Sequence, residues 1–101
     1  MNVIWTRKAE TSFNNIVDYL LKFWTVEITS KFVDEVDNTI NLIVEHPKMF
    51  KISKYDNQSR EAFITKHTTM FYRIINNSIE IEYFWGNFDD PDKISKLIKY
   101  K

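Results

Sequence analysis

The sequence predicts a small α+β domain in which a strand and a helical hairpin precede a three-stranded antiparallel meander. Two observations predict this class. Apolar residues recur every three to four positions from about residue 7 to the EHP sequence at 45–47, which is the period of amphipathic helices. From residue 60 the apolar period changes to two, as in half-buried strands. A length of 101 residues fits a single domain (1–101), and 44% hydrophobic residues are enough for a core.

The first two elements expected are a short strand over residues 2–5 and a helix over about 7–23. NVIW is an apolar run that suits a strand. Thr6 can cap the helix behind it, because a threonine hydroxyl accepts a hydrogen bond from a free N–H of the first turn. Helical spacing then places these residues on one apolar stripe: Ala9, Phe13, Ile16, Val17, Leu20 and Trp24.

A second helix is expected from Thr25 to the EHP sequence. Thr25 is a cap candidate, and Glu27 lies in the first turn, where the helix dipole favours a negative charge. Proline disfavours helical geometry at the preceding residue, so His46 is expected to cap the end of the helix rather than to bind a ligand. Because the two helices have almost no linker, they predict a helical hairpin. Its second apolar stripe consists of Ile28, Phe32, Val36, Ile40 and Ile43.

Residues 48–59 have no clean period and are expected to form a loop with at most a short extended piece. Three strands should follow, over residues 60–66, 70–75 and 79–85. Asn76-Asn77 is a plausible two-residue turn between the last two strands, because asparagine tolerates positive φ.

That turn predicts the register of the last hairpin. It places Arg73 opposite Glu80, where an ion pair would explain the arginine without a functional role. The same register puts Phe71 opposite Glu82. The other face is wholly apolar or aromatic, so Tyr72 and Tyr83 are expected in the core beneath the helices. The pairs on that face are Ile74–Ile79, Tyr72–Ile81 and Met70–Tyr83.

The last residues, DPDKISKLIKYK, predict a short basic C-terminal helix or a frayed tail. Asp90 can cap such a helix and Pro91 suits its first position. Four lysines fall toward the C-terminal end, where the helix dipole favours positive charge: Lys93, Lys96, Lys99 and Lys101.

Composition excludes several classes of function. There is no cysteine, so disulfides, a thiolate nucleophile and a cysteine-type zinc site are ruled out. The two histidines are too far apart in sequence for a metal motif, and no metal or cofactor is expected. Zero formal net charge argues against strong non-specific binding to nucleic acid. Without a signal-peptide pattern or a membrane-spanning apolar run, the protein is expected to be soluble and cytoplasmic, with no membrane partner.

The order and spacing of several short motifs carry a family resemblance. These are WTRKAE at the start of the first helix, EHP at the end of the second, and SREAFITKHTTMFYRIINNSIEIEYFWGNFDDP over the meander. Together they resemble the RelE/ParE superfamily of bacterial type II toxins, and the resemblance covers essentially the whole chain. It implies a toxin that is neutralised by direct binding of a cognate antitoxin.

The superfamily implies two mechanisms, and fold alone does not choose between them. RelE-like members cleave mRNA on the translating ribosome without a metal. ParE-like members poison DNA gyrase, and this action is favoured here over the RelE-like one. A third alternative is a degenerate, non-toxic binding module of the same fold.

A metal-free ribonuclease needs side chains that activate the ribose hydroxyl, stabilise phosphate charge and protonate the leaving oxygen. The catalytic candidates are Arg60, which opens the first meander strand, and Lys66 and His67 in the following turn. Arg60 would contact phosphate, and His67 is the better general base because its ordinary pKa is about 6.5. The alternatives are a solvated strand-end arginine and a polar hairpin turn.

Two positions depart from the nuclease pattern. RNA-cleaving relatives usually carry arginine in the turn after the last long strand, where this sequence has Phe88. They usually carry a second basic residue on the middle strand, where this sequence has Thr68-Thr69-Met70. Since phenylalanine supplies neither charge nor a hydrogen bond, these departures favour the ParE-like alternative. Phe88 and the tail lysines Lys93, Lys96 and Lys99 are instead candidates for binding the target or the antitoxin.

Overall fold

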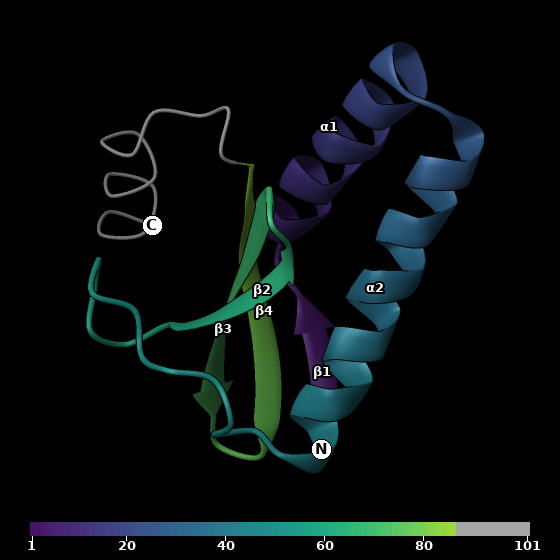
Figure 1. The fold of residues 1–101 in the computed structure, drawn as a ribbon. Helices are drawn as coiled ribbons and strands as arrows, with labels where there is room; N and C mark the ends of the chain where they lie inside the picture. The colour runs from purple at the N-terminus through teal and green to yellow at the C-terminus, as the bar shows by residue number, and fades with distance from the viewer. Residues whose placement is uncertain (87–101) are drawn as a thin grey trace.

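The structure, a computed structural model, describes residues 1–86 and has one layer of two helices packed on one four-stranded sheet (Figure 1). All six expected elements in this range are present within two residues of their expected bounds, so the α+β class is confirmed. The predicted C-terminal helix or tail, with Phe88 and its lysines, lies outside the described residues. The elements are β1 (Asn2–Trp5), α1 (Arg7–Phe23), α2 (Val26–Glu45), β2 (Arg60–Thr65), β3 (Thr68–Ile75) and β4 (Ser78–Gly86).

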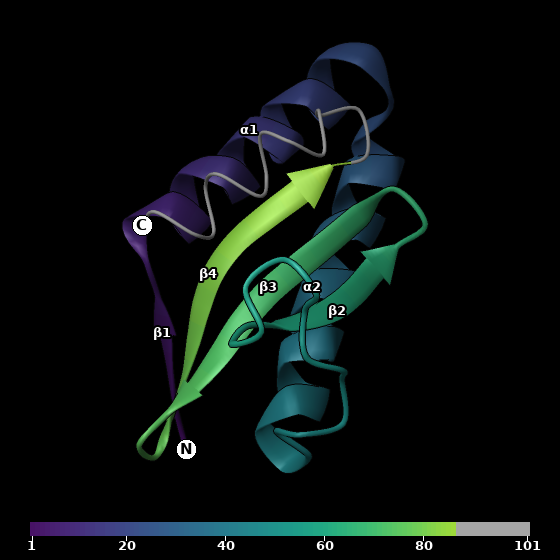
Figure 2. The same cartoon turned by 90° about the vertical axis from the view of Figure 1, so that its left-hand side faces the viewer.

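The sheet has the order β1-β4-β3-β2 (Figure 2). The meander β2–β3–β4 is antiparallel, as expected. β1 extends it by pairing in parallel with β4, with Val3 beside Ile79 and Trp5 beside Ile81. This pairing joins the two ends of the described chain, so the first strand helps to hold the last one in place.

Thr6 fastens the junction between β1, α1 and β4. Its Oγ1 accepts a hydrogen bond from the N–H of Ala9 at 3.1 Å, which caps α1 as predicted. The same hydroxyl is within donating distance of two carbonyl oxygens of β4, that of Ile81 at 2.9 Å and that of Glu82 at 3.1 Å. One side chain therefore satisfies a helix end and ties it to the neighbouring strand.

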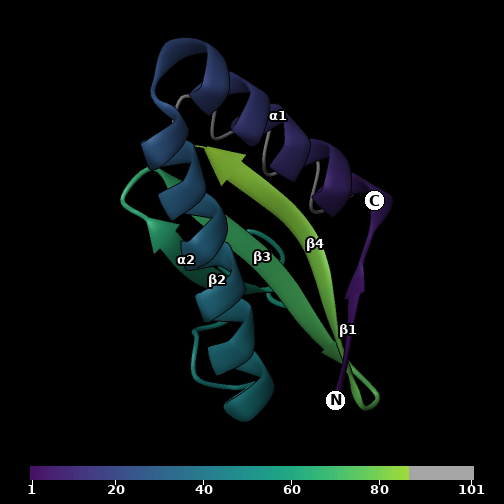
Figure 3. The ribbon, with the colours of Figure 1, turned by 90° about the vertical axis from the view of Figure 1, so that its right-hand side faces the viewer.

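Both helices cover the same face of the sheet, α1 along β4 and α2 along β2 (Figure 3). Tyr72 lies in this core, as predicted, and Phe84 stacks on Trp5 with ring centroids 5.4 Å apart. Trp24 and Ile28 fall on the predicted helix stripes, yet they are 57% and 40% exposed. The fully buried side chains of the core are Val36, Ile43, Ala62, Met70, Tyr72, Ile79, Ile81, Phe84 and Ala9.

The helix ends follow the predicted caps. The Thr25 side chain accepts from the N–H of Ile28 at 3.1 Å and begins α2. His46 is the C-terminal cap of α2, and its backbone N–H donates to the carbonyl of Leu42 at 2.8 Å.

The register of the β3–β4 hairpin agrees with the prediction only near the turn. Asn76 has φ of 55°, and Ile75 pairs with Ser78, as expected for the two-residue turn. The register shifts between Phe71 and Tyr72, so that Phe71 faces Tyr83 rather than Glu82, and Met70 faces Phe84 rather than Tyr83.

This β-bulge overturns the prediction that Tyr83 belongs to the core. A bulge places one extra residue on one strand of the pair. On β4 that residue falls between Ile81 and Phe84, whose side chains both belong to the core, so Glu82 and Tyr83 both face away from the core. Tyr83 packs against Phe71 on the opposite face of the sheet.

Candidate functional site on the open face of the sheet

The face of the sheet turned away from the helices is called the open face here. The connection between α2 and β2 crosses it (Figure 2). Phe71 is fully buried on this face, against Tyr55 from the connection and Tyr83 and Trp85 from β4. The open face thus has a small aromatic cluster of its own, separate from the core beneath the helices.

Asp56 folds the connection into a tight turn. Its Oδ1 accepts hydrogen bonds from the backbone N–H groups of Gln58 at 3.0 Å and Ser59 at 2.9 Å, and its Oδ2 accepts from the Ser59 hydroxyl at 2.8 Å. Asn57, next to it, has φ of 59°, which asparagine tolerates well. These bonds aim the carboxylate of Asp56 toward the sheet.

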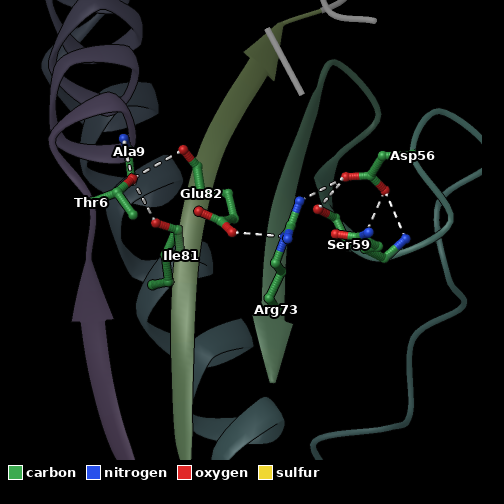
Figure 4. A network of polar contacts seen from close by, with 8 residues as sticks. Thr6, Ala9, Asp56, Ser59, Arg73, Ile81 and Glu82 are labelled. Atoms are coloured by element: carbon green, nitrogen blue, oxygen red, sulfur yellow. Dashed lines mark hydrogen bonds and ion pairs between the residues drawn. The ribbon is translucent and has the colours of Figure 1, made fainter. Parts of the chain in front are cut away.

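Arg73 on β3 lies between two carboxylates (Figure 4). Its Nε is 3.0 Å from Oε1 of Glu82, and one terminal nitrogen is 3.4 Å from Oδ2 of Asp56. Both acidic side chains are only 5% exposed, while that of Arg73 is 23% exposed. The predicted ion pair with Glu80 is wrong: Glu80 pairs with Arg73 through the backbone register, but the bulge brings Glu82 to the guanidinium instead.

The pKa of Asp56 is lower than that of an ordinary aspartate. Burial alone would raise this pKa. The hydrogen bonds from Gln58 and Ser59 and the positive charge of Arg73 together outweigh burial, because all of them favour the ionised form. Ionised Asp56 therefore stabilises the fold above the pKa of about 3.9 that aspartate has in an unfolded chain.

The Asp56→Asn variant is expected to lose about 1–2 kcal/mol of unfolding free energy at neutral pH, because asparagine keeps one acceptor but loses the charge. Since the folded pKa is lowered, the wild-type advantage should disappear as pH falls below about 4. Urea unfolding at several pH values measures this, with Asp34→Asn on the exposed surface of α2 as the control. An equal deficit at pH 7 and at pH 3 would contradict the role of the ionised carboxylate.

The charged groups on the described part of the open face are mostly acidic. The basic side chains there are those of Arg73 on β3 and of Lys54 in the connection, whose amino group lies 5.9 Å from the centre of the Tyr55 ring; the acidic ones are those of Asp56, Glu61, Glu80 and Glu82. Glu61 and Glu82 are also buried, at 9% and 4% exposure. A phosphate brought to this face would meet net negative charge in a partly desolvated setting, where repulsion is strong.

Arg60 does not lie on the open face. It pairs with Tyr72, whose side chain is in the core beneath the helices, so Arg60 shares that side of the sheet. Its Nη1 donates to the carbonyl of Phe50 at 2.6 Å, and the Tyr72 hydroxyl donates to the carbonyl of Pro47 at 2.7 Å. Burial raises the pKa of Tyr72, although the nearby charge of Arg60 opposes this. Arg60 and Tyr72 thus hold the chain that leaves α2.

Lys66 and His67 lie in the exposed turn between β2 and β3. The backbone N–H of His67 donates to Oγ1 of Thr65 at 3.2 Å. At about 3.3 Å per residue, six residues of strand separate Arg60 from Lys66 by roughly 20 Å. The three catalytic candidates are therefore not brought into one centre, and their catalytic role stays a prediction.

The sequence predicted that Glu80 and Glu82 lie on the face away from the core, but not that Asp56 and Glu82 pair with Arg73. Asp56 lies in a polar loop where a turn-forming aspartate is ordinary, and Glu82 reaches Arg73 only because of the bulge. The middle-strand positions Thr68, Thr69 and Met70 are buried and carry no charge. Within residues 1–86, no cluster of three or more His, Cys, Asp or Glu side chains is arranged to hold a metal ion. Neither helix in that range has the length and apolar character to cross a membrane.

Comparison with known proteins identifies the family. The family model of the ParE toxin of the type II toxin–antitoxin system parDE matches residues 3–85. A solved chain described as the chromosomal ParDE TA system from P. aeruginosa matches with a TM-score of 0.71 and 19% identity, over 85% of this chain and 95% of that one. At that identity the likeness shows a shared fold. No curated protein matches the sequence. The family match covers most of the chain, which therefore belongs to the ParE toxin family and is the toxin component of a type II toxin–antitoxin module.

Proposed function

We propose that this toxin acts by binding DNA gyrase in the cytoplasm and does not cleave RNA. The observation that carries the proposal is the neutralisation of Arg73, the one basic side chain that the described strands place on the open face. Two nearly buried carboxylates, from Asp56 and Glu82, lie within 3.4 Å of its guanidinium. An arginine committed in this way is poorly suited to stabilise charge on a phosphate.

The other basic candidates support the same proposal. Arg60 lies on the helix side of the sheet and donates to a backbone carbonyl, while Lys66 and His67 lie in the turn after β2, roughly 20 Å from Arg60. Metal-free RNA cleavage needs its acid, base and charge-stabilising groups within hydrogen-bond reach of one phosphate. Action by binding needs no such convergence.

The antitoxin is the toxin's partner in the module, and we propose that it docks on the outer edge of β2. β2 is the last strand in the sheet order, so one side of it has no neighbouring strand from the described part of the chain. Among residues 1–86, the connection covers the first residues of this edge, where the N–H of Glu61 donates to the carbonyl of Lys51 at 3.0 Å. Phe63, farther along, is 61% exposed. An extended segment can add to such an edge through backbone hydrogen bonds and cover an apolar side chain.

The Lys66→Ala/His67→Ala variant is expected to arrest growth as strongly as wild type when it is induced without antitoxin, and mRNA in a translating extract should stay intact with either protein. Both side chains are exposed in a turn, so the variant should fold normally. Arg60→Gln tests the third candidate. Because Arg60 supports the connection after α2, thermal melting must first show that this variant is folded. Cut mRNA with wild type, lost in these folded variants, would overturn the proposal in favour of RNA cleavage.

A further inference from the structure

The end of the helical hairpin exposes large apolar side chains. We call this surface the hairpin tip. Phe23, Trp24 and Val26, which are consecutive except for Thr25, are 63%, 57% and 69% exposed. The helix turns on either side add three more exposed apolar side chains, those of Tyr19, Leu21 and Ile28. Soluble monomers rarely leave so many large apolar residues together in water unless they bind a partner.

The tip projects because the helices are longer than the core they cover. The last buried residue of α1 is Ile16, and the first of α2 is Thr29. The turns between them extend past the sheet (Figure 1). No core requirement explains why this stretch should be apolar, since its side chains contribute little to burial on folding.

The tip is nevertheless a defined shape. The backbone N–H of Trp24 donates to the carbonyl of Leu20 at 2.8 Å, and Thr25 caps α2. The rings of Tyr19 and Phe23 are 5.1 Å apart, and the amino group of Lys22 lies 5.4 Å from the Phe23 ring centre. A binding surface that is already ordered loses less entropy when it binds.

The surroundings of the tip define the chemistry of its partner. A hollow of about 500 Å³ on the first turns of α2 has Val26 and Ile28 in its lining, beside the carboxylates of Glu27 and Asp34. From Asp18 to Asp37 all charged side chains are exposed, and acidic ones outnumber basic ones: the basic residues are Lys22 and Lys31, and the acidic ones are Asp18, Glu27, Asp34, Glu35 and Asp37. An acidic border repels nucleic acid and anionic lipid, and it attracts a protein surface with lysine or arginine.

We infer that the hairpin tip is the surface by which the toxin engages its target, inserting into an apolar recess bordered by basic side chains. This inference rests on the proposed function, in which the target is gyrase. The tip projects past the sheet (Figure 1), and a projecting apolar surface fits a recess in a large folded protein. The antitoxin segment proposed for β2 binds an edge instead, so the two partners use different surfaces.

The test compares Phe23→Ser/Trp24→Ser with wild type in gyrase supercoiling, in growth arrest and in antitoxin binding. Because buried aromatic contacts dominate interfaces, at least tenfold more variant than wild type should be needed to inhibit gyrase. Growth arrest should be lost, and antitoxin binding should not change. Ile75→Thr, which alters a 40% exposed residue at the opposite end of the molecule, is the matched control and should act as wild type. Glu27→Lys/Asp34→Lys should weaken inhibition through charge alone.

The outcomes separate the inference from the proposed function. Wild type that arrests growth without inhibiting gyrase refutes the gyrase target, whereas loss of arrest in the tip variant with antitoxin binding intact still supports the tip as the target-binding surface. A folded tip variant as toxic as wild type overturns the inference. The inference is also overturned if the tip variant loses only antitoxin binding, loses binding to phosphatidylglycerol vesicles that wild type shows, or loses a dimer that light scattering detects for wild type. Each of these results would assign the tip to another binding partner.

Discussion

Replacing Arg73 with methionine is expected to lower the free energy of unfolding by about 3 kcal/mol. The substitution keeps much of the side-chain volume but removes the charge that lies 3.0 Å from Glu82 and 3.4 Å from Asp56. Both carboxylates are 5% exposed, so water cannot replace the guanidinium. Breaking a buried pair from one side is costly because it leaves a buried charge uncompensated.

The double variant Arg73→Met/Glu82→Gln separates this cause from a loss of packing. If an uncompensated carboxylate is the main cost, neutralising Glu82 should recover about half of the lost stability or more. Urea unfolding followed by circular dichroism measures both, and Arg7→Met, on the exposed face of α1, is the control. An Arg73→Met protein that unfolds at the wild-type urea concentration would show that the two ion pairs contribute nothing to the fold.

Local patterns were enough to predict the helices, their caps and the hairpin turn. Thr6 and Thr25 cap through bonds within three residues, and Asn76 needs only its own tolerance of positive φ. Such features depend on neighbours in the sequence, so they can be recognised from the sequence alone.

Features that depend on distant residues were missed. The pairing of β1 with β4 joins residues more than seventy positions apart, and the bulge at Glu82 on β4 is not signalled by any change in the apolar pattern. Because of that bulge, Tyr83 lies on the open face rather than in the predicted core, and Glu82 rather than Glu80 forms the ion pair with Arg73. A register predicted from a turn holds only as far along the hairpin as the two strands pair residue by residue.

The prediction of the catalytic candidates also depended on distances in space that the sequence does not give. Arg60, Lys66 and His67 are close in sequence, but an extended strand holds its ends roughly 20 Å apart. The helical period likewise predicted on which side of the helices Trp24 and Ile28 lie, but not whether they are buried. The period does not indicate where the sheet beneath the helices ends. These two exposed side chains are part of the hairpin tip.

Inhibition of gyrase supercoiling is the second large effect expected. The purified toxin should block the introduction of supercoils into relaxed plasmid, and equimolar antitoxin should prevent this. The physical reason is that the open-face arginine is neutralised and the other catalytic candidates within residues 1–86 do not converge, so we expect the toxin to act through contact rather than through chemistry on RNA.

The supercoiling assay is therefore the most direct measurement. A translating extract that contains a defined mRNA is treated with the same toxin as a parallel reaction. The expected result is relaxed plasmid at toxin concentrations that leave the mRNA intact. Fully supercoiled plasmid together with cut mRNA would contradict the account.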